Sequence, residues 1–229
     1  MFTIPFREFT SLFKSIRSII IIAVLFGVTI GAAKIISNFQ TQLQELGIGD
    51  DAYAGALMAL LLFAAPLFVT SLAHSVVNKE MASRTVRFLA TKTSRANIIL
   101  GKFLGNLFFW AICLFLALLL IIPFSNTFHI VEWFQMVVFV SYFIGLAVFL
   151  STIFRSPSLT MFLGITISIA LQVLGLWSLA TENVFVKMIG YITPYFYYSQ
   201  DQTYMSYIVV LFTLIFVILS LLIFRKRDL

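Results

Sequence analysis

The sequence predicts an all-α polytopic membrane protein with six transmembrane helices. Of its 229 residues, 61% are hydrophobic and 10% are charged, and the mean hydropathy is +1.05. A soluble globule of this length needs more polar surface than this composition provides. Six apolar runs are also long enough to cross a bilayer, which takes roughly 20 helical residues. These runs are residues 19–36, 52–77, 98–124, 131–153, 159–180 and 204–224.

The Lys and Arg residues divide unequally between the two sides of this arrangement. Six spans leave both termini on one side, and that side holds 13 of the 15 Lys and Arg residues, leaving Lys34 and Lys187 on the other. An excess of cations marks the cytoplasmic side. We therefore expect a single transmembrane domain over residues 1–229 in the cell membrane, with both termini cytoplasmic. The cations on that side are Arg7, Lys14, Arg17, Lys79, Arg84, Arg87, Lys92, Arg95, Lys102, Arg155, Arg225, Lys226 and Arg227.

The net charge of +6 has the same origin. Because the cations are spread along one membrane face, the charge indicates an orientation in the bilayer. We therefore expect membrane lipid as a partner and no nucleic acid.

Residues 1–18 are typical of an amphipathic helix that lies in the cytoplasmic interface. No small-residue cleavage site follows the first apolar run, so this segment is not a cleavable signal. Two interpretations stay open: a simple anchor, or an elbow that couples motion at the inner face to the first span. The apolar residues that recur at helical steps of three and four are Phe2, Phe6, Phe9, Phe13 and Ile16.

The first span contains Gly27 and Gly31, a Gly-x-x-x-Gly pair that lets a second helix approach closely. The pair indicates either packing within the chain or contact with a second copy. Residues 37–51 then follow as an external loop, long enough for one short helix.

The second span contains Pro66, which removes a backbone donor and is expected to kink the helix. Thr70, Ser71 and His74 follow in its cytoplasmic half and need hydrogen-bond partners. A lone histidine without further ligands at metal-binding spacing favours a hydrogen-bonded packing residue over a metal or proton-relay role. Gln172 in the fifth span needs a partner too, either a neighbouring helix or a hydrated path.

Residues 78–102 form the one long polar segment between two apolar runs. Glu80 and Arg84 lie at i and i+4 with the acid first, which favours a short helix. Thr93 or Ser94 is then placed to cap the helix that continues into the third span.

Residues 181–203 are too interrupted to span a membrane and too aromatic to lie in water. We expect two short half-helices, hinged between Gly190 and Pro194, that re-enter the outer leaflet. Either they form an aromatic belt or they gate a central pathway. The tyrosines expected at interface depth are Tyr191, Tyr195, Tyr197 and Tyr198. The candidate pathway residues are Thr70, His74, Gln172, Gly190, Tyr191, Pro194 and Tyr195.

No catalytic, cofactor-binding or metal-ligating constellation is present in the sequence. Gly101-Lys102 is followed by Phe103, and Ala96 stands where a phosphate-binding loop needs its first glycine. The single cysteine, Cys113, allows no disulfide and no cysteine metal cluster. Energy for uphill movement of any cargo would therefore come from a partner, for which residues 78–102 are the expected docking surface.

Residues 80–102 resemble the cytoplasmic loop of ABC-2 type transporter permeases. Glu80, Ser83-Arg84-Thr85, Phe88-Leu89, Ser94-Arg95 and the later Lys102 follow the order of that loop. Arg84 stands in place of the usual glycine, and no proline precedes Ser94. The six spans, the amphipathic start, the broken segment before the last span and the Arg-rich C-terminus are similar to the same family over the full chain.

This resemblance implies the membrane subunit of an ABC exporter without an ATPase of its own. Two permease chains, identical or paralogous, would pair through spans one and five, with Gly27 and Gly31 as candidate packing residues. Two separate ATP-binding subunits would bind ATP and Mg²⁺, while this chain binds no cofactor. The expected cargo is a hydrophobic or amphipathic peptide, lipid or drug. The implied coupling residues are Glu80, Ser83, Arg84, Thr85, Arg87, Phe88, Leu89 and Arg95.

The alternative is a membrane subunit that transports nothing, such as an immunity or sensor protein that sequesters a peptide. A transporter would show substrate-dependent ATP hydrolysis with its ATPase. A sequestering protein would bind peptide equally well without nucleotide.

Overall fold

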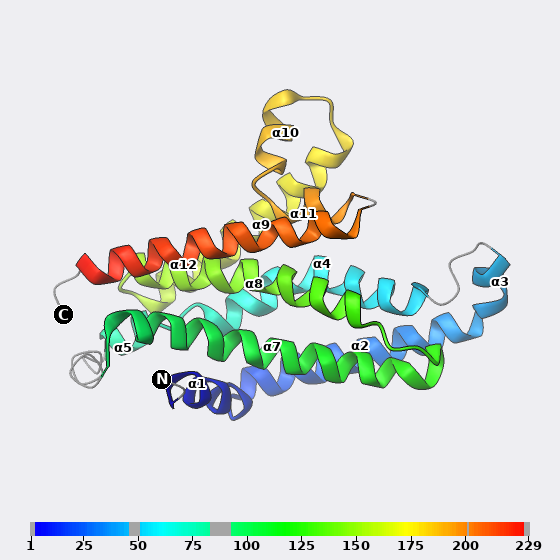
Figure 1. The fold of residues 1–229 in the computed structure, drawn as a ribbon, viewed down its shortest axis with the longest axis horizontal. Helices are drawn as coiled ribbons and strands as arrows, with labels where there is room; N and C mark the ends of the chain where they lie inside the picture. Colours follow the sequence, from blue (N-terminus) through cyan, green and yellow to red (C-terminus); the bar gives the residue numbers. More distant parts are fainter. Residues whose placement is uncertain (1–2, 46–50, 83–92, 201, 227–229) are drawn as a thin grey trace.

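The computed structural model describes residues 3–45, 51–82, 93–200 and 202–226, and within these ranges every regular element is a helix (Figure 1). The six long helices carry the candidate membrane spans, and shorter helices join them. In chain order the elements are α1 (Thr3–Phe13), α2 (Ile16–Asn38), α3 (Gln40–Glu45), α4 (Asp51–Ala73), α5 (Asn78–Ala82), α7 (Arg95–Ser125), α8 (Ile130–Ile153), α9 (Pro157–Ala180), α10 (Val184–Gly190), α11 (Pro194–Tyr198), η1 (Thr203–Ile208) and α12 (Val209–Lys226).

Six helices are long and apolar enough to cross a membrane, and each contains most or all of one predicted run. The prediction of six spans is confirmed at this level, with boundaries that differ by a few residues. The second run is not one continuous α-helix, because α4 ends at Ala73 and a turn leads into α5. The last run begins as the 3-10 helix η1 before α12.

Helix α8 lies at the centre of the bundle and packs against α4, α7, α9 and α12. In its apolar window 78% of the residues are buried, against 22% in α2 and in α9. In lipid, an apolar helix face needs no covering. The exposed faces of α2 and α9 are therefore compatible with contact to lipid or to another protein.

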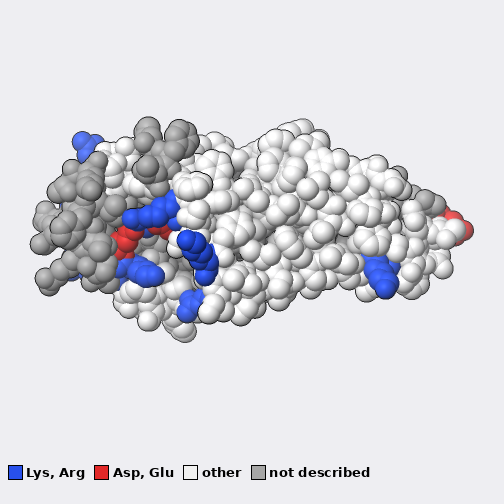
Figure 2. Space-filling model, turned by 90° about the horizontal axis from the view of Figure 1, so that it is seen from below, with Lys and Arg blue, Asp and Glu red and all other residues white. Residues whose placement is uncertain are grey.

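The charged side chains lie mainly at the two ends of the bundle. Helices α1 and α5 and the end of α12 lie at one end, and α3 and the turn between α7 and α8 at the other (Figure 1). Figure 2 shows a broad band without charged side chains between these ends on the face that it displays. We call the first end the basic end. Its described cations are Arg7, Lys14, Arg17, Lys79, Arg95, Lys102, Arg155, Arg225 and Lys226.

The N-terminal helix is shorter than expected, and only part of its apolar side contacts the bundle. Helix α1 ends at Phe13, and α2 begins at Ile16, which is 75% exposed. Phe6 is 68% exposed, whereas Ile4 is buried and Phe9 packs against the core. The break after Phe13 separates Ile16 from the predicted stripe, whereas Phe6 and Phe9 stay on one side of α1, where both line a pocket against α7. Contact of this stripe with the membrane interface stays a prediction. Phe2, also in that stripe, lies outside the described residues.

The local signals at the helix ends agree with the structure. Ser94 precedes α7 and its hydroxyl accepts a hydrogen bond from the backbone N–H of Asn97 at 3.2 Å, which confirms the predicted N-cap. Asn126 ends the same helix in the left-handed conformation, with φ at 56°. The short helix predicted between the first two spans is present as α3.

Pro66 explains how the outer hairpin, formed by α10 and α11, is attached to α4. A proline inside a helix leaves the carbonyl four residues earlier without its usual donor, here that of Leu62. The hydroxyl of Tyr195 donates to this carbonyl at 2.8 Å. The Gln172 amide Nε2 donates to the neighbouring carbonyl of Phe63 at 3.2 Å. Two other elements, α11 and α9, thus meet α4 at its proline.

The hairpin also packs on α9 through two glycines. A Cβ at Gly190 would lie 2.2 Å from Oγ of Ser178, and a Cβ at Gly175 would lie 2.6 Å from Cδ2 of Tyr195. The turn between the two half-helices lies between Gly190 and Pro194, as predicted. Gly190 is required there for the close approach to α9, because a side chain would collide with Ser178.

Two of the four hairpin tyrosines, Tyr195 and Tyr198, point into the bundle. Tyr195 is 2% exposed and is bonded to α4, and Tyr198 donates through its hydroxyl to the carbonyl of Gln135 in α8. Tyr197 donates to the carbonyl of Tyr191, whose ring is 47% exposed. The hydroxyls of Tyr195 and Tyr198 point inward because unpaired carbonyls on α4 and α8 are costly inside a membrane.

We expect Tyr195→Phe to destabilise the protein by about 1 kcal/mol, because it removes the donor to the Leu62 carbonyl. The melting temperature of the purified protein in detergent measures this. Tyr204→Phe, at an exposed tyrosine, is the matched control. In a Pro66→Ala background, where a backbone N–H is restored, the loss from Tyr195→Phe should shrink. An equal loss in both backgrounds would contradict the assignment.

Candidate functional site

Helix α1 lies against α7 because two glycines remove the side chains that would hold the helices apart. A Cβ at Gly101 would lie 2.8 Å from Cγ2 of Ile4. A Cβ at Gly105 would lie 2.8 Å from the carbonyl oxygen of Pro5 and 2.7 Å from Cβ of Glu8. Any larger residue at these two positions pushes α1 away. The close contact brings Glu8 beside the next residue of α7, Lys102.

Four charged side chains from three helices meet at this contact, and we call them the ion cluster: Arg7, Glu8, Glu80 and Lys102. Lys102 Nζ lies 2.9 Å from Oε1 of Glu8 and 3.1 Å from Oε1 of Glu80. Arg7 Nη2 lies 2.7 Å from the same Glu80 oxygen and 3.7 Å from Glu8. The two cations and two anions balance, and α1, α5 and α7 are joined through them.

Burial makes this pairing obligatory for Lys102. Its side chain is 2% exposed, while those of Glu8 and Glu80 are 17% and 16% exposed. A buried ammonium without an anion is costly, so Lys102 needs both carboxylates beside it. Arg7 is 54% exposed and adds a weaker, solvent-screened contact.

Helix α5 is also fixed from its other side. The backbone N–H groups of Val77 and Asn78 donate to the hydroxyl of Ser151 at 2.9 and 3.1 Å. The Asn78 amide donates to the hydroxyl of Thr160 at 2.7 Å. The start of α5 is therefore bonded to the end of α8 and the start of α9. Displacement of α5 would disturb four neighbouring helices.

The structure describes two of the predicted coupling residues, Glu80 and Arg95. Glu80 belongs to the ion cluster, whereas the Arg95 guanidinium donates to the carbonyl of Arg225 in α12 at 2.8 Å. The expected pairing of Glu80 with Arg84 involves a residue outside the described ranges. The other predicted coupling residues outside these ranges are Ser83, Thr85, Arg87, Phe88 and Leu89.

The sequence alone did not identify Arg7 and Lys102 as partners of Glu80, nor Glu8 as a partner of Lys102. The sequence did contain one indication that Lys102 has a partner. Lys102 lies near the start of an apolar helix, where a charged side chain needs a counter-charge. The identity of that partner depended on how α1 folds back. Among the described residues, no group of three or more His, Cys, Asp or Glu side chains could hold a metal ion.

The candidate pathway residues fall into two groups. Gln172 and Tyr195 meet at Pro66, as described above, and Gly190 and Pro194 flank the hairpin turn. The Thr70 hydroxyl donates within α4 to the carbonyl of Pro66, and Nδ1 of His74 lies 2.8 Å from the carbonyl oxygen of Ser71. The second group thus has its hydrogen-bond partners on its own helix.

Gly27 and Gly31 lie on an open face of α2. A Cβ at either position would have no heavy atom within 4 Å. The interpretation that these glycines serve packing within the chain therefore has no support among the described residues. The face is available to lipid or to another chain.

A comparison with protein families matches residues 7–229 to the family described as ABC-2 family transporter protein. No curated protein matches the chain.

We expect Lys102→Met to destabilise the protein by about 3 kcal/mol, because the two carboxylates of the ion cluster lose their buried counter-charge. The melting temperature of the detergent-purified protein reports this loss. Lys79→Met removes an exposed cation from the same helix as Glu80 and is the control, with little change expected. If the two variants have the same melting temperature, Lys102 does not hold α1 and α5 in place.

Proposed function

Because the chain belongs to the ABC-2 family of transporter proteins, we propose that it is the membrane-spanning permease of an ATP-driven exporter. The observation that carries this proposal is the family match over residues 7–229, which contains all six candidate spans. ATP and Mg²⁺ are bound and ATP is hydrolysed in a separate subunit, two copies of which serve a pair of permease chains.

We assign the docking of the ATP-binding subunit to the segment that begins with α5 and ends before α7. Two observations support this. The described ends of this segment, α5 and the start of α7, lie at the basic end, whose cations indicate the cytoplasmic side. Its first helix is joined through Glu80 to Arg7 of α1 and Lys102 of α7. A partner that pushes on α5 therefore moves α1 and α7 as well, since separating Glu80 from Lys102 would expose a buried charge.

Helix α4 provides the connection from α5 toward the outer hairpin. The two helices form one candidate span, from Ala52 to Met81. At its middle, α4 is bonded to Tyr195 and Gln172 beside Pro66. Movement of α5 along the membrane normal shifts α4, and the hairpin that is hydrogen-bonded to α4 shifts with it. The hairpin is then an outer gate that opens when the ATPase subunits close.

The cargo is a hydrophobic or amphipathic molecule, such as a peptide, lipid or drug. The candidate lining supports this, because the residues that meet at Pro66 are aromatic or uncharged polar. The open face of α2 with Gly27 and Gly31 supports pairing with a second permease chain, identical or paralogous.

We expect Arg84→Ala combined with Arg87→Ala to lower co-purification of the ATP-binding subunit about tenfold, because two cations are removed from the proposed docking segment. The melting temperature of the permease alone should change little, since the ion cluster of Arg7, Glu8, Glu80 and Lys102 stays intact. Lys34→Ala combined with Lys187→Ala, which lie in α2 and α10 outside the basic end, is the control. Undiminished co-purification of the Arg84 and Arg87 variant would exclude this surface.

Cysteine labelling tests the orientation. The native Cys113 is buried, so it should react little with a membrane-impermeant maleimide. Gln42→Cys, in the exposed part of α3, should label in intact cells, and Ser156→Cys, in the exposed turn between α8 and α9, only after permeabilisation. The reverse pattern would invert the proposed topology.

A further inference from the structure

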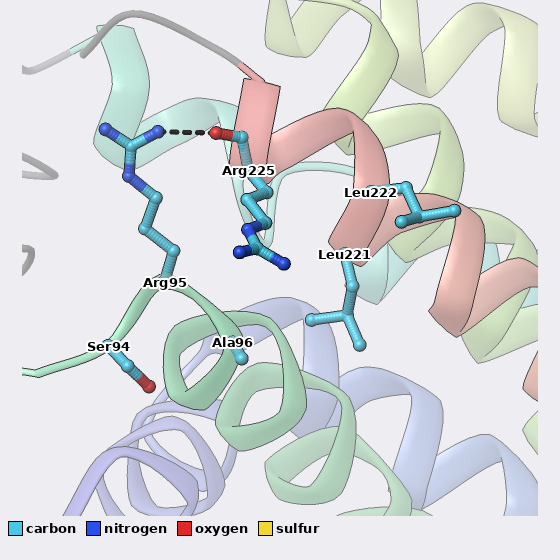
Figure 3. Close-up of a pocket in the computed structure, with 6 residues that line it drawn as sticks. All are labelled: Ser94, Arg95, Ala96, Leu221, Leu222 and Arg225. Carbon is cyan, nitrogen blue, oxygen red and sulfur yellow. Dashed lines mark hydrogen bonds between the residues drawn. The ribbon is translucent and has the colours of Figure 1, made fainter.

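A pocket of about 560 Å³ lies at the basic end between the start of α7 and the last turns of α12. It is separate from the ion cluster and from the hairpin. Figure 3 shows the Arg225 and Leu221 side chains pointing from α12 into the space above the first turn of α7. The lining residues are Ser94, Arg95, Ala96, Leu221, Leu222 and Arg225.

The charge of this pocket is entirely positive among its lining residues. The Arg95 guanidinium is fixed by its hydrogen bond to the Arg225 carbonyl at 2.8 Å. Within the part of the chain that the structure describes, the Arg225 guanidinium has no hydrogen bond or ion pair. Two guanidinium groups at one pocket are suited to a phosphate, which they bind through paired N–H donors. The N-terminus of the long helix α7 adds a favourable dipole.

The walls of the pocket favour a phosphate that carries acyl chains. Leu221 and Leu222 form its α12 side. Leu222 is 52% exposed and continues a stripe along α12, which also contains Leu211, Ile215 and Ile218 at 59%, 51% and 52% exposure. These residues recur at steps of four and three, so they lie on one helix face that runs from the pocket into the uncharged band. A soluble phosphate would use only the arginines and leave this stripe uncovered.

We propose that this pocket binds the headgroup of an anionic phospholipid from the leaflet at the basic end. The phosphate lies between Arg225 and Arg95, and an acyl chain follows the α12 stripe from Leu222 toward Leu211. Basic pockets at the cytoplasmic ends of transmembrane helices are suited to such lipids. The bound lipid fastens the end of α12 to the start of α7, next to the proposed docking segment. It is a resident lipid, and its site is distinct from the proposed route of the cargo.

Native mass spectrometry of the purified chain with added phosphatidylglycerol or phosphatidylcholine tests this proposal. The wild type should retain phosphatidylglycerol in preference to phosphatidylcholine. Arg225→Gln should lower the affinity for phosphatidylglycerol about fivefold, the effect of one cation near an anionic headgroup. Because the Arg225 guanidinium has no partner among the described residues, this variant should melt like the wild type. Arg155→Gln removes an exposed cation at the same end, outside the pocket, and should bind lipid like the wild type.

Three outcomes would overturn the proposal. The first is equal retention of phosphatidylglycerol by the wild type and Arg225→Gln. The second is displacement of the lipid by inorganic phosphate, which would identify a site for a free anion. The third is its displacement by the ATP-binding subunit, which would identify the pocket as a protein contact. Persistence of the lipid against both competitors, with loss in Arg225→Gln, supports a lipid site.

Discussion

The burial of one ammonium group, that of Lys102, determines the arrangement at the basic end of the bundle. An unpaired charge at 2% exposure is not tolerated, so carboxylates from α1 and α5 must both reach it. Glu8 reaches it only because Gly101 and Gly105 let α1 lie directly on α7. The position of the N-terminal helix and that of α5 therefore depend on the same cation.

A second polar group, which its own helix leaves without a partner, organises the middle of the bundle. Pro66 frees the Leu62 carbonyl in a place where lipid supplies no donor, and Tyr195 provides one from a hairpin more than a hundred residues away in sequence. The two sites follow one rule. Exposing apolar surface to lipid costs little free energy. Buried polar groups and small residues at close contacts therefore decide which helices meet.

The two sites also lie on one continuous span, since α4 leads through a short turn into α5. This continuity gives the proposed permease a physical connection from the proposed ATPase docking segment to the proposed outer gate. Glu80 at the end of the span and Pro66 near its middle are each bonded to other helices. The proposed lipid pocket lies apart from this route. It is lined in part by α12, the helix that packs closely on the central α8.

The sequence by itself determined the helical spans, the short turns between them, the Ser94 cap and the two half-helices around Gly190 to Pro194, because each depends on residues close together in the chain. Only the tertiary structure decided the partners. The i, i+4 rule pairs Glu80 with Arg84, which lies outside the described residues, and no spacing in the chain indicates the contacts of Glu80 with Arg7 and Lys102 of other helices. Periodicity placed Phe6 and Phe9 on one side of α1, yet only the contact with α7 decides that Phe9 packs against the core while Phe6 is 68% exposed. The rotation of one helix against another is fixed by contacts across the chain, such as those at Gly101, Gly105 and Gly190, and spacing within a single helix does not contain them.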